Sequence, residues 1–322
     1  ITAIKTGSTE GSGTAGTVGS ALTGTYGTLT LNADGSYSYV ADQSAADDLD
    51  SGDTAYDYFN YTVSDGTDTD IAVLRITVTG INDAPVAQND VGVINEDATL
   101  TVSNSANANV SGSYDATGEH SGDVINTSSS SHTDSDPDDS ASLVVSAIRT
   151  GGTEGSGTAG SIGSALTGTY GQLTIAANGS YSYVANQSAA DDLDAGDSAT
   201  DVFNYTLSDG TATDIGTITI TVLGLNDPVV AVNDTGSVNE DATLTVSDGS
   251  GDIIANNDTD ADDSASLVVS AIRLGGTEGS GTAGTVGSAL TGTYGQLTLN
   301  ANGSYTYVAN QAAADDLDAG DT

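Results

Sequence analysis

The sequence predicts an all-β fold, organised as a tandem array of antiparallel β-sandwich domains. A glycine-rich block starts at Ala3, at Ala147 and again at Ala271, so its copies lie 144 (147 − 3) and 124 (271 − 147) residues apart. Segments that alternate polar and apolar residues, as half-buried strands do, follow the block in each copy. This period is far longer than the roughly 20 to 50 residues of a solenoid repeat, so each copy is expected to be a domain with its own core.

The glycine-rich block is followed by a β-hairpin in each repeat. In the first copy, Thr28-Leu-Thr-Leu31 and Ser36-Tyr-Ser-Tyr-Val40 both alternate, and Asn32-Ala-Asp-Gly35 separates them. The Asp-Gly pair predicts a primed turn, because both residues readily take positive φ angles. The pattern recurs with Asn-Gly at 178–179 and at 302–303.

Further strand signals complete the repeat. They are, in chain order, Phe59-Asn-Tyr-Thr-Val63 and 72–79 around the turn Ser64-Asp-Gly66, and then 98–102 and 142–148 before the next glycine-rich block. Roughly seven strands in a repeat are typical of a β-sandwich. Only short acidic stretches such as 188–197 are expected to form a helical turn.

The repeats divide the chain into three predicted domains. The predicted segments are a domain at 1–82, a linker at 83–94, a domain at 95–226, a linker at 227–238 and a domain at 239–322. The first domain is expected to lack its N-terminal strands and the third its C-terminal strands, so the sequence is expected to be an internal part of a longer protein.

A Ser- and Asn-rich insertion at 104–133 accounts for the greater length of the second repeat. A surface excursion is expected there, because loops lengthen at little entropic cost. Both histidines, His120 and His132, lie in the insertion and have no counterpart in the other repeats, so a metal or catalytic role is not favoured for them.

Charge and composition exclude several classes of partner. The chain carries 45 acidic residues against 4 Lys and Arg, a net charge of −41, which excludes nucleic acid because affinity for phosphates rests on basic side chains. Divalent cations are the partners that this balance favours, although acidic surfaces also suit proteins of salty water. The chain has no Cys, and no apolar run approaches the ~18 residues of a membrane span, so neither disulfides nor membrane insertion are expected.

Two motifs that suggest catalysis have simpler interpretations. Gly11-Ser-Gly-Thr-Ala-Gly16 matches the G-x-G-x-x-G of nucleotide sites, but β and loop signals follow it instead of a helix, so a flexible hairpin tip is expected. The acid pair Asp47-Asp48 recurs in each repeat, yet glycoside hydrolysis also needs a cleft lined by aromatic residues, and the chain has no Trp. The sequence therefore does not predict an enzyme.

Acidic residues gather in a repeating pattern at both boundaries between repeats. The run Asp134-Ser-Asp-Pro-Asp-Asp139 returns as Asp258-Thr-Asp-Ala-Asp-Asp263, and acids in each linker precede it. Alternate Asp residues in a turn can direct several carboxylates at one centre, and Ca²⁺ takes six to eight oxygen ligands. The run is not an EF-hand, because it has Asp where that loop needs Gly and no Glu closes it. A solvated acidic loop is the alternative.

The pattern thus predicts Ca²⁺ as cofactor. The predicted ligands are, around the first boundary, Asp83, Asp90, Glu96, Asp97, Asp134, Asp136 and Asp138, and around the second, Asp227, Asp234, Glu240, Asp241, Asp258, Asp260 and Asp262.

Several motifs in fixed order resemble the VCBS repeat of large bacterial surface proteins. They are Gly27-Thr-Leu-Thr-Leu-Asn-Ala-Asp-Gly-Ser-Tyr-Ser-Tyr39, Phe59-Asn-Tyr-Thr-Val-Ser-Asp-Gly66, Ile76-Thr-Val-Thr-Gly-Ile-Asn-Asp-Ala-Pro85 and Ala231-Val-Asn-Asp234. The resemblance covers essentially the whole chain except 104–133. It implies Ig-like or cadherin-like β-sandwich domains in an elongated array, within secreted adhesins that are often exported by type I secretion and act in attachment or biofilm.

The linker also resembles the calcium linker of cadherins. The similarity lies at Asn82, Asp83 and Pro85, whereas Gly80 stands where cadherins have an Asp, and the proline of the second linker has shifted to Pro228. The exact calcium ligands therefore cannot be carried over from cadherins residue by residue.

Together these inferences give a leading function and an alternative. The leading hypothesis is a calcium-rigidified stalk or fibre segment at the bacterial cell surface, whose first partners are the neighbouring repeats of the same chain. The alternative is a binding module that recognises surface glycans or identical chains through the glycine-rich loops, including lateral assembly into extracellular filaments.

Overall fold

The computed structural model describes residues 1–103, 122–126, 132–138, 141–249, 251–262, 266–318 and 320–321. The fold is nearly all β, and the predicted class of tandem β-sandwich domains is confirmed. The chain forms two compact units, one of 1–187 with 200–222 and one of 188–199 with 223–322.

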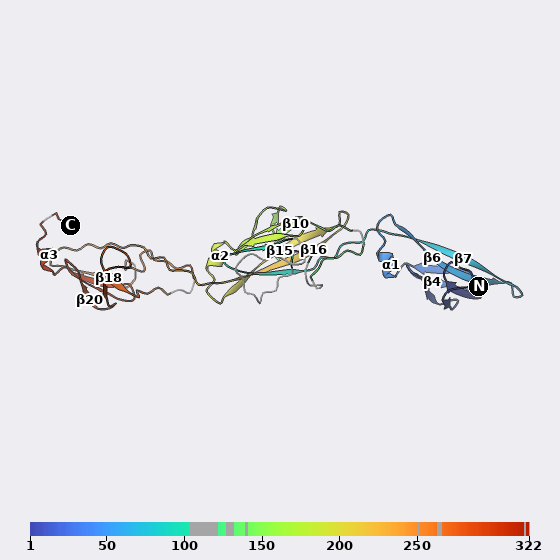
Figure 1. Ribbon diagram of the computed structural model, residues 1–322, viewed down its shortest axis with the longest axis horizontal. Helices are drawn as coiled ribbons and strands as arrows, with labels where there is room; N and C mark the ends of the chain where they lie inside the picture. The colour runs from blue at the N-terminus through green and yellow to red at the C-terminus, as the bar shows by residue number, and fades with distance from the viewer. Residues whose placement is uncertain are drawn as a thin grey trace. The chain divides into compact units, whose positions relative to one another are not determined.

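The second repeat contains two β-sheets (Figure 1). Its strands are β8 (Asp90–Asn95), β9 (Thr99–Val102), β10 (Val144–Thr150), β11 (Ala159–Gly160), β12 (Leu166–Thr167), β13 (Gln172–Ile175), β14 (Tyr181–Val184), β15 (Ser198–Ser208) and β16 (Thr213–Leu223). One sheet has the order β11-β10-β15-β16-β8 and the other the order β12-β13-β14-β9. Alternate residues of β16, Ile218, Ile220 and Val222, are fully buried, as expected for a strand with one face toward a core.

The first repeat has the same plan. Its strands are β1 (Ala3–Thr6), β2 (Ala15–Gly16), β3 (Ala21–Thr23), β4 (Thr28–Leu31), β5 (Tyr37–Val40), β6 (Thr54–Ser64) and β7 (Thr69–Thr79). They form the sheets β2-β1-β6-β7 and β3-β4-β5. The core is small, with Ile4, Leu29 and Phe59 at its centre, which agrees with the low aromatic content.

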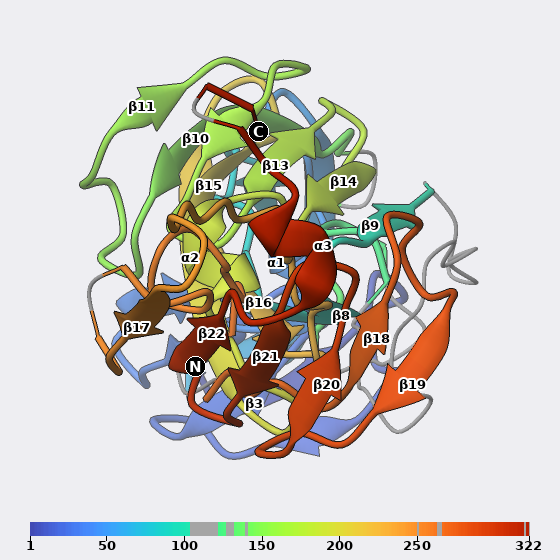
Figure 2. The same ribbon diagram turned by 90° about the vertical axis from the view of Figure 1, so that its left-hand side faces the viewer.

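The third repeat contains β17 (Thr243–Val246), β18 (Ile272–Leu274), β19 (Thr282–Gly284), β20 (Ala289–Thr291), β21 (Gln296–Leu299) and β22 (Tyr305–Val308). Figure 2 shows β20, β21 and β22 side by side, in a sheet of order β17-β22-β21-β20, and the separate pair β18-β19. Among its described residues this repeat has no strands that correspond to β15 and β16.

Each repeat also contains one helical turn in its acidic stretch, as predicted for the second repeat. These turns are α1 (Ser44–Asp47), α2 (Ser188–Asp191) and α3 (Ala312–Asp315). No helix in the described ranges has the length and apolar character needed to cross a membrane.

The turn of the first hairpin differs from the prediction. Gly35 has φ of 90°, but neither Ala33 nor Asp34 has a positive φ, so the primed turn is wrong. The Gly35 N–H donates to Asn32 O, which closes an ordinary turn before a left-handed glycine. Asp34 instead accepts hydrogen bonds from Ser36 N and Ser36 Oγ.

The glycine-rich block is not the flexible tip that the sequence predicts. The buried side chain of Asn60, on β6, accepts a 3.1 Å hydrogen bond from Gly11 N and donates a 2.9 Å bond to Ser12 O. Gly13 has φ of 97°, and a Cβ there would lie 1.8 Å from Thr6 O, so the loop needs glycine at this position. Asn204 holds the same loop of the second repeat through Gly155 N and Ser156 O.

Part of the predicted surface excursion at 104–133 is buried. Asp123 and Val124 are fully buried and Ile125 is nearly so, so the prediction is wrong for 122–126. Asp123 Oδ1 accepts hydrogen bonds from Ile125 N and Asn126 N, and Asp252 in the third repeat makes the same turn. The segment is therefore shared by both repeats, and the remainder of the insertion, His120 included, lies outside the described residues.

Candidate metal centre

Three segments meet at the start of the second repeat. They are the linker after Asn82, the loop 132–138 and the turn between β15 and β16. A bridge between Val86 and Ser135, with N–H to O distances of 2.7 and 3.1 Å, fixes the loop against the linker. Asp209 closes the β15–β16 turn by accepting hydrogen bonds from Thr211 N and Ala212 N.

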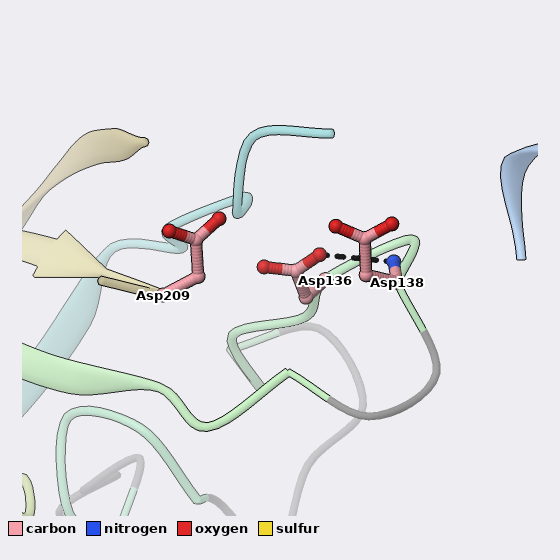
Figure 3. Close-up of side chains that lie close together, drawn as sticks. All are labelled: Asp136, Asp138 and Asp209. Carbon is pink, nitrogen blue, oxygen red and sulfur yellow. Dashed lines mark hydrogen bonds between the residues drawn. The ribbon is translucent and has the colours of Figure 1, made fainter. Parts of the chain in front are cut away.

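This arrangement brings three carboxylates together. Asp136, Asp138 and Asp209 each offer an oxygen that lies within 4.8 Å of the others (Figure 3). Two oxygens bound to one Ca²⁺ at about 2.4 Å are at most about 4.8 Å apart, so the three carboxylates can share one ion.

Part of the ligand capacity of these carboxylates is unused. Asp138 is 8% exposed, and its Oδ2 accepts a 3.1 Å hydrogen bond from Asp83 N, whereas its buried Oδ1 has no hydrogen-bond partner. Asp136 Oδ1 accepts a 2.9 Å bond from Asp138 N, and its buried Oδ2 likewise has none. Leaving charged oxygens buried without partners is costly, so a cation fits this group better than empty space does.

The electrostatics of the three acids differ. Burial raises the pKa of Asp136 above its ordinary value, and the charges of Asp138, Asp209 and Asp83 add to the rise. The hydrogen bond from Thr211 N is the main cause that lowers the pKa of Asp209, so this acid keeps its charge easily. A divalent cation would cancel the repulsion that Asp136 experiences.

Basic side chains do not supply that compensation in the described structure. Lys5, Arg149 and Arg273 donate to carbonyl groups of the glycine-rich loops, and Arg75 lies 4.8 Å from the centre of the Tyr56 ring. The charge of the acidic group is therefore left for an ion or for solvent to balance.

A second group of predicted ligands lies deeper in the repeat. The Tyr205 hydroxyl is 2.9 Å from Asp90 Oδ2, 3.3 Å from Asp134 Oδ2 and 3.0 Å from Val124 O. Asp90 and Asp134 are almost fully buried, and burial raises the pKa of Asp134 to about 7. This network ties the start of β8 to the loop 132–138, so it supports the outer acids from within.

Other predicted ligands are not brought to the three carboxylates. Glu96 is buried after the end of β8, and Asp97 is exposed with φ of 58° and donates from its N–H to Ala185 O. In the third repeat, Glu240 and Asp241 are both exposed. The structure does not place these four residues in the group of Asp136, Asp138 and Asp209.

The third repeat builds the same loop. Asp262 Oδ2 accepts a 3.2 Å bond from Asp227 N, and Asp260 Oδ1 accepts a 3.2 Å bond from Asp262 N. Asp258 Oδ1 accepts from Val232 N, and Asp234 Oδ1 accepts from an Asn256 side chain. Asp262 Oδ1 is buried without a hydrogen-bond partner, as is Asp138 Oδ1 in the second repeat.

Sequence reasoning missed two acids at this end of the repeat. Asp209 belongs to the Ser-Asp-Gly turn and was expected only to close a hairpin. Asp214 accepts a 2.9 Å hydrogen bond from Ala87 N and so positions the linker. The available signal was the Ser-Asp-Gly turn itself, which occurs at 64–66 and again at 208–210, but it gives no distance to the Asp-x-Asp run.

Comparisons with known proteins support a cadherin-like assignment. The model of a family described as bacterial cadherin-like domain matches residues 82–224 and 226–321. A search of curated proteins found no match.

Three solved structures illustrate the likeness. Extracellular cadherin domains 1–4 of protocadherin gamma B7 are 12% identical, with a TM-score of 0.36, and the match covers 90% of this chain and 57% of that one. For PcdhgB3 EC1-4 the values are 11%, 0.35, 97% and 63%. For an endo-fucoidan hydrolase from glycoside hydrolase family 107 they are 11%, 0.24, 94% and 36%. All these TM-scores are below 0.5, and the chain spans less than two thirds of each structure.

Proposed function

Because the chain belongs to the bacterial cadherin-like domain family, we propose that it is a calcium-stiffened structural segment of an extracellular surface protein. Domains of this family suggest extracellular tandem modules with a structural or adhesive role, and the family is generally non-enzymatic. The finer role proposed for this chain is that of a stalk or spacer within a VCBS-type adhesin or biofilm fibre.

The observation that carries the proposal is the group of Asp136, Asp138 and Asp209. Its ligands are oxygen atoms alone, which suits hard cations such as Ca²⁺. Two of its oxygens are buried and have no hydrogen-bond partner. These three residues would hold the ion, and the ion would supply positive charge at the point where the linker enters the repeat.

Ion binding at this place would act on the linker through existing contacts. Asp83 donates its N–H to Asp138, and the Asn82 side chain donates a 2.9 Å bond to Asp209 Oδ2. An ion that fixes both carboxylates therefore also fixes the linker residues bonded to them. With net charge −41 on the chain, neutralised acids would in addition reduce self-repulsion.

A calcium titration of the whole chain tests this proposal. Melting temperature is measured in excess chelator and after addition of Ca²⁺, for the native chain, for Asp138→Asn and for the exposed control Asp192→Asn. A free ion concentration of 100 times Kd stabilises the binding state by about 2.7 kcal/mol, so a clear rise is expected for the native chain and the control. The rise should be much smaller for Asp138→Asn.

An unchanged melt in excess chelator would remove the calcium mechanism, and an equal response of Asp138→Asn would remove the site. Small-angle scattering with and without Ca²⁺ separately tests stiffening, because a stiffened chain keeps a narrower distribution of lengths. Type I secretion, identical chains in a fibre and surface glycans as partners remain predictions, and a glycan array tests the last.

A further inference from the structure

The inner face of one sheet in the third repeat is open. A groove of about 1420 Å³ runs over β21 and β22 and is lined by Leu244, Leu297, Tyr305 and Tyr307 among others. In the second repeat the residues at the positions of Leu297 and Tyr307, which are Leu173 and Tyr183, are fully buried. Leu297 and Tyr307 themselves are only half-buried, so apolar surface that is covered elsewhere is accessible here.

Chemical groups beside the groove form what we call the carboxylate socket: the N–H groups of Thr293, Tyr294 and Gly295 together with the Tyr307 hydroxyl. None of the four has a hydrogen-bond partner among the described residues. The loop is nevertheless folded, because Gly292 N donates a 2.8 Å bond to Gly295 O.

The same socket is filled in the other repeats. In the second repeat, Asp201 accepts hydrogen bonds of 2.8, 3.0 and 3.1 Å from the N–H groups of Thr169, Tyr170 and Gly171, and one of 2.7 Å from the Tyr183 hydroxyl. In the first repeat, Asp57 occupies the corresponding socket with almost the same distances. The third socket is therefore complementary to a carboxylate.

A second recognition element is the glycine-rich loop at 275–281. In the second repeat the corresponding loop binds the amide of Asn204 through Gly155 N, Gly151 O and Ser156 O. The third loop keeps its shape, since a Cβ on Gly281 would lie 1.9 Å from Leu274 O, much as Gly157 meets Thr150 O. The described residues supply no Asn side chain to it.

A third element is the edge of β18. In the second repeat β10 pairs with β15 in the register Ile148 to Tyr205, Arg149 to Asn204 and Thr150 to Phe203. In the third repeat β18 pairs with β19 alone, so its other edge is open to a strand. An incoming strand in the same register would place its Asp in the carboxylate socket and its Asn at the glycine-rich loop.

We propose that this groove binds a β-hairpin with the strand pattern Asp-x-Phe-Asn-Tyr, the pattern of β15–β16 in another repeat of this kind. The pattern occurs as Asp57-Tyr-Phe-Asn-Tyr61 and as Asp201-Val-Phe-Asn-Tyr205. Strand alternation puts Asp and Phe on the inner face and Asn on the other, which suits the two sockets. The Phe ring would pack edge-on against Tyr307, as Phe203 packs against Tyr183 at 6.4 Å and 69°.

Backbone pairing along an exposed edge with side-chain pockets for alternate residues is a known route to peptide binding. The consequence for this protein is that a hairpin donated from outside the third repeat would complete its sandwich without a covalent link.

The test uses the whole chain and a fluorescent peptide with the sequence of residues 198–223. Binding is followed by fluorescence anisotropy, with peptides carrying Asp201→Asn or Asn204→Ala as controls. Each substitution removes hydrogen bonds to buried partners, so each is expected to weaken binding by about tenfold or more. The variant Tyr307→Phe should weaken the native peptide but change the Asp201→Asn peptide little, because both remove the same bond.

Matched controls separate this site from general stickiness. Tyr183→Phe alters the same bond in the filled second repeat and should leave peptide affinity unchanged. Equal binding of the native and Asp201→Asn peptides, or no binding at all, overturns the proposal. A dimer of the chain that persists in excess peptide also overturns it, because a second copy would then occupy the groove.

Discussion

The Tyr183 hydroxyl on β14 donates a 2.7 Å hydrogen bond to Asp201 Oδ2 on β15, and this bond joins the two sheets of the second repeat. Asp201 is 4% exposed and also accepts three backbone N–H groups of the Gly168 to Gly171 turn. The first repeat has the same arrangement around Asp57. A buried carboxylate therefore stabilises each sandwich that contains the long hairpin.

Replacing Asp201 by Asn should destabilise the second repeat by about 2 to 4 kcal/mol, because an amide can accept fewer of these bonds and places its own NH₂ beside N–H donors. Urea unfolding of the chain measures the loss, with the exposed substitution Asp192→Asn as control. Equal unfolding midpoints for the two variants would show that the carboxylate does not stabilise the fold.

The same pair predicts a dependence of stability on alkaline pH. Burial raises the pKa of Tyr183 above its ordinary value, and the hydrogen bond to Asp201 raises it further. A pKa that is raised in the folded state means that the stabilisation is complete below about pH 10, the unfolded value, and is lost as pH rises above it.

The substitution Tyr183→Phe should lower stability at neutral pH and flatten the decline above about pH 10, because the titrating group is gone. Urea midpoints across this range, with phenolate absorbance as a second readout, measure the effect. A decline of the same steepness in Tyr183→Phe would assign the pH dependence to other groups.

Strand positions were predictable from sequence because their signals are local. The alternation in 28–31 and the hydrophobic β16 pattern define strands without knowledge of their neighbours. The role of Asn60 was not predictable, since nothing in the sequence shows that its amide reaches the loop at Gly11, 49 residues away. The same holds for Asp209, whose approach to Asp136 depends on how the hairpin and the loop pack.

The acid runs were predictable as a group but not as a geometry. Asp134, Asp136 and Asp138 alternate, yet Asp134 turns inward to Tyr205 while the other two face Asp209. Burial of 122–126 was hidden because the Ser-rich sequence around it outweighs the short apolar pair Val124 and Ile125. Comparison of Ser-Gly-Asp-Val-Ile with Ser-Gly-Asp-Ile-Ile in the third repeat was the available signal.

The substitution Asp136→Asn should have opposite effects with and without Ca²⁺. In chelator it removes a carboxylate whose pKa is raised by burial and by three neighbouring acids, so the repeat should become more stable by about 1 kcal/mol. In Ca²⁺ it removes a proposed ligand, so the variant should gain less stability than the native chain. Melting curves under both conditions measure the two signs, and destabilisation in chelator would contradict the electrostatic argument.

The glycine-rich loops predict a specific pattern of proteolysis. Each loop carries one exposed glutamate, Glu10, Glu154 or Glu278, and the first two loops are held by Asn60 and Asn204. A glutamate-specific protease should therefore cleave after Glu278 sooner than at the other two, because local opening precedes cleavage.

The variant Asn204→Ala should bring cleavage after Glu154 to the rate seen at Glu278 and leave Glu10 unchanged, since Asn60 still holds the first loop. Mass spectrometry of timed digests gives the three rates in one experiment. Equal rates at all three sites in the native chain would show that the asparagine side chains do not restrain the loops, because the third loop has no such contact among the described residues.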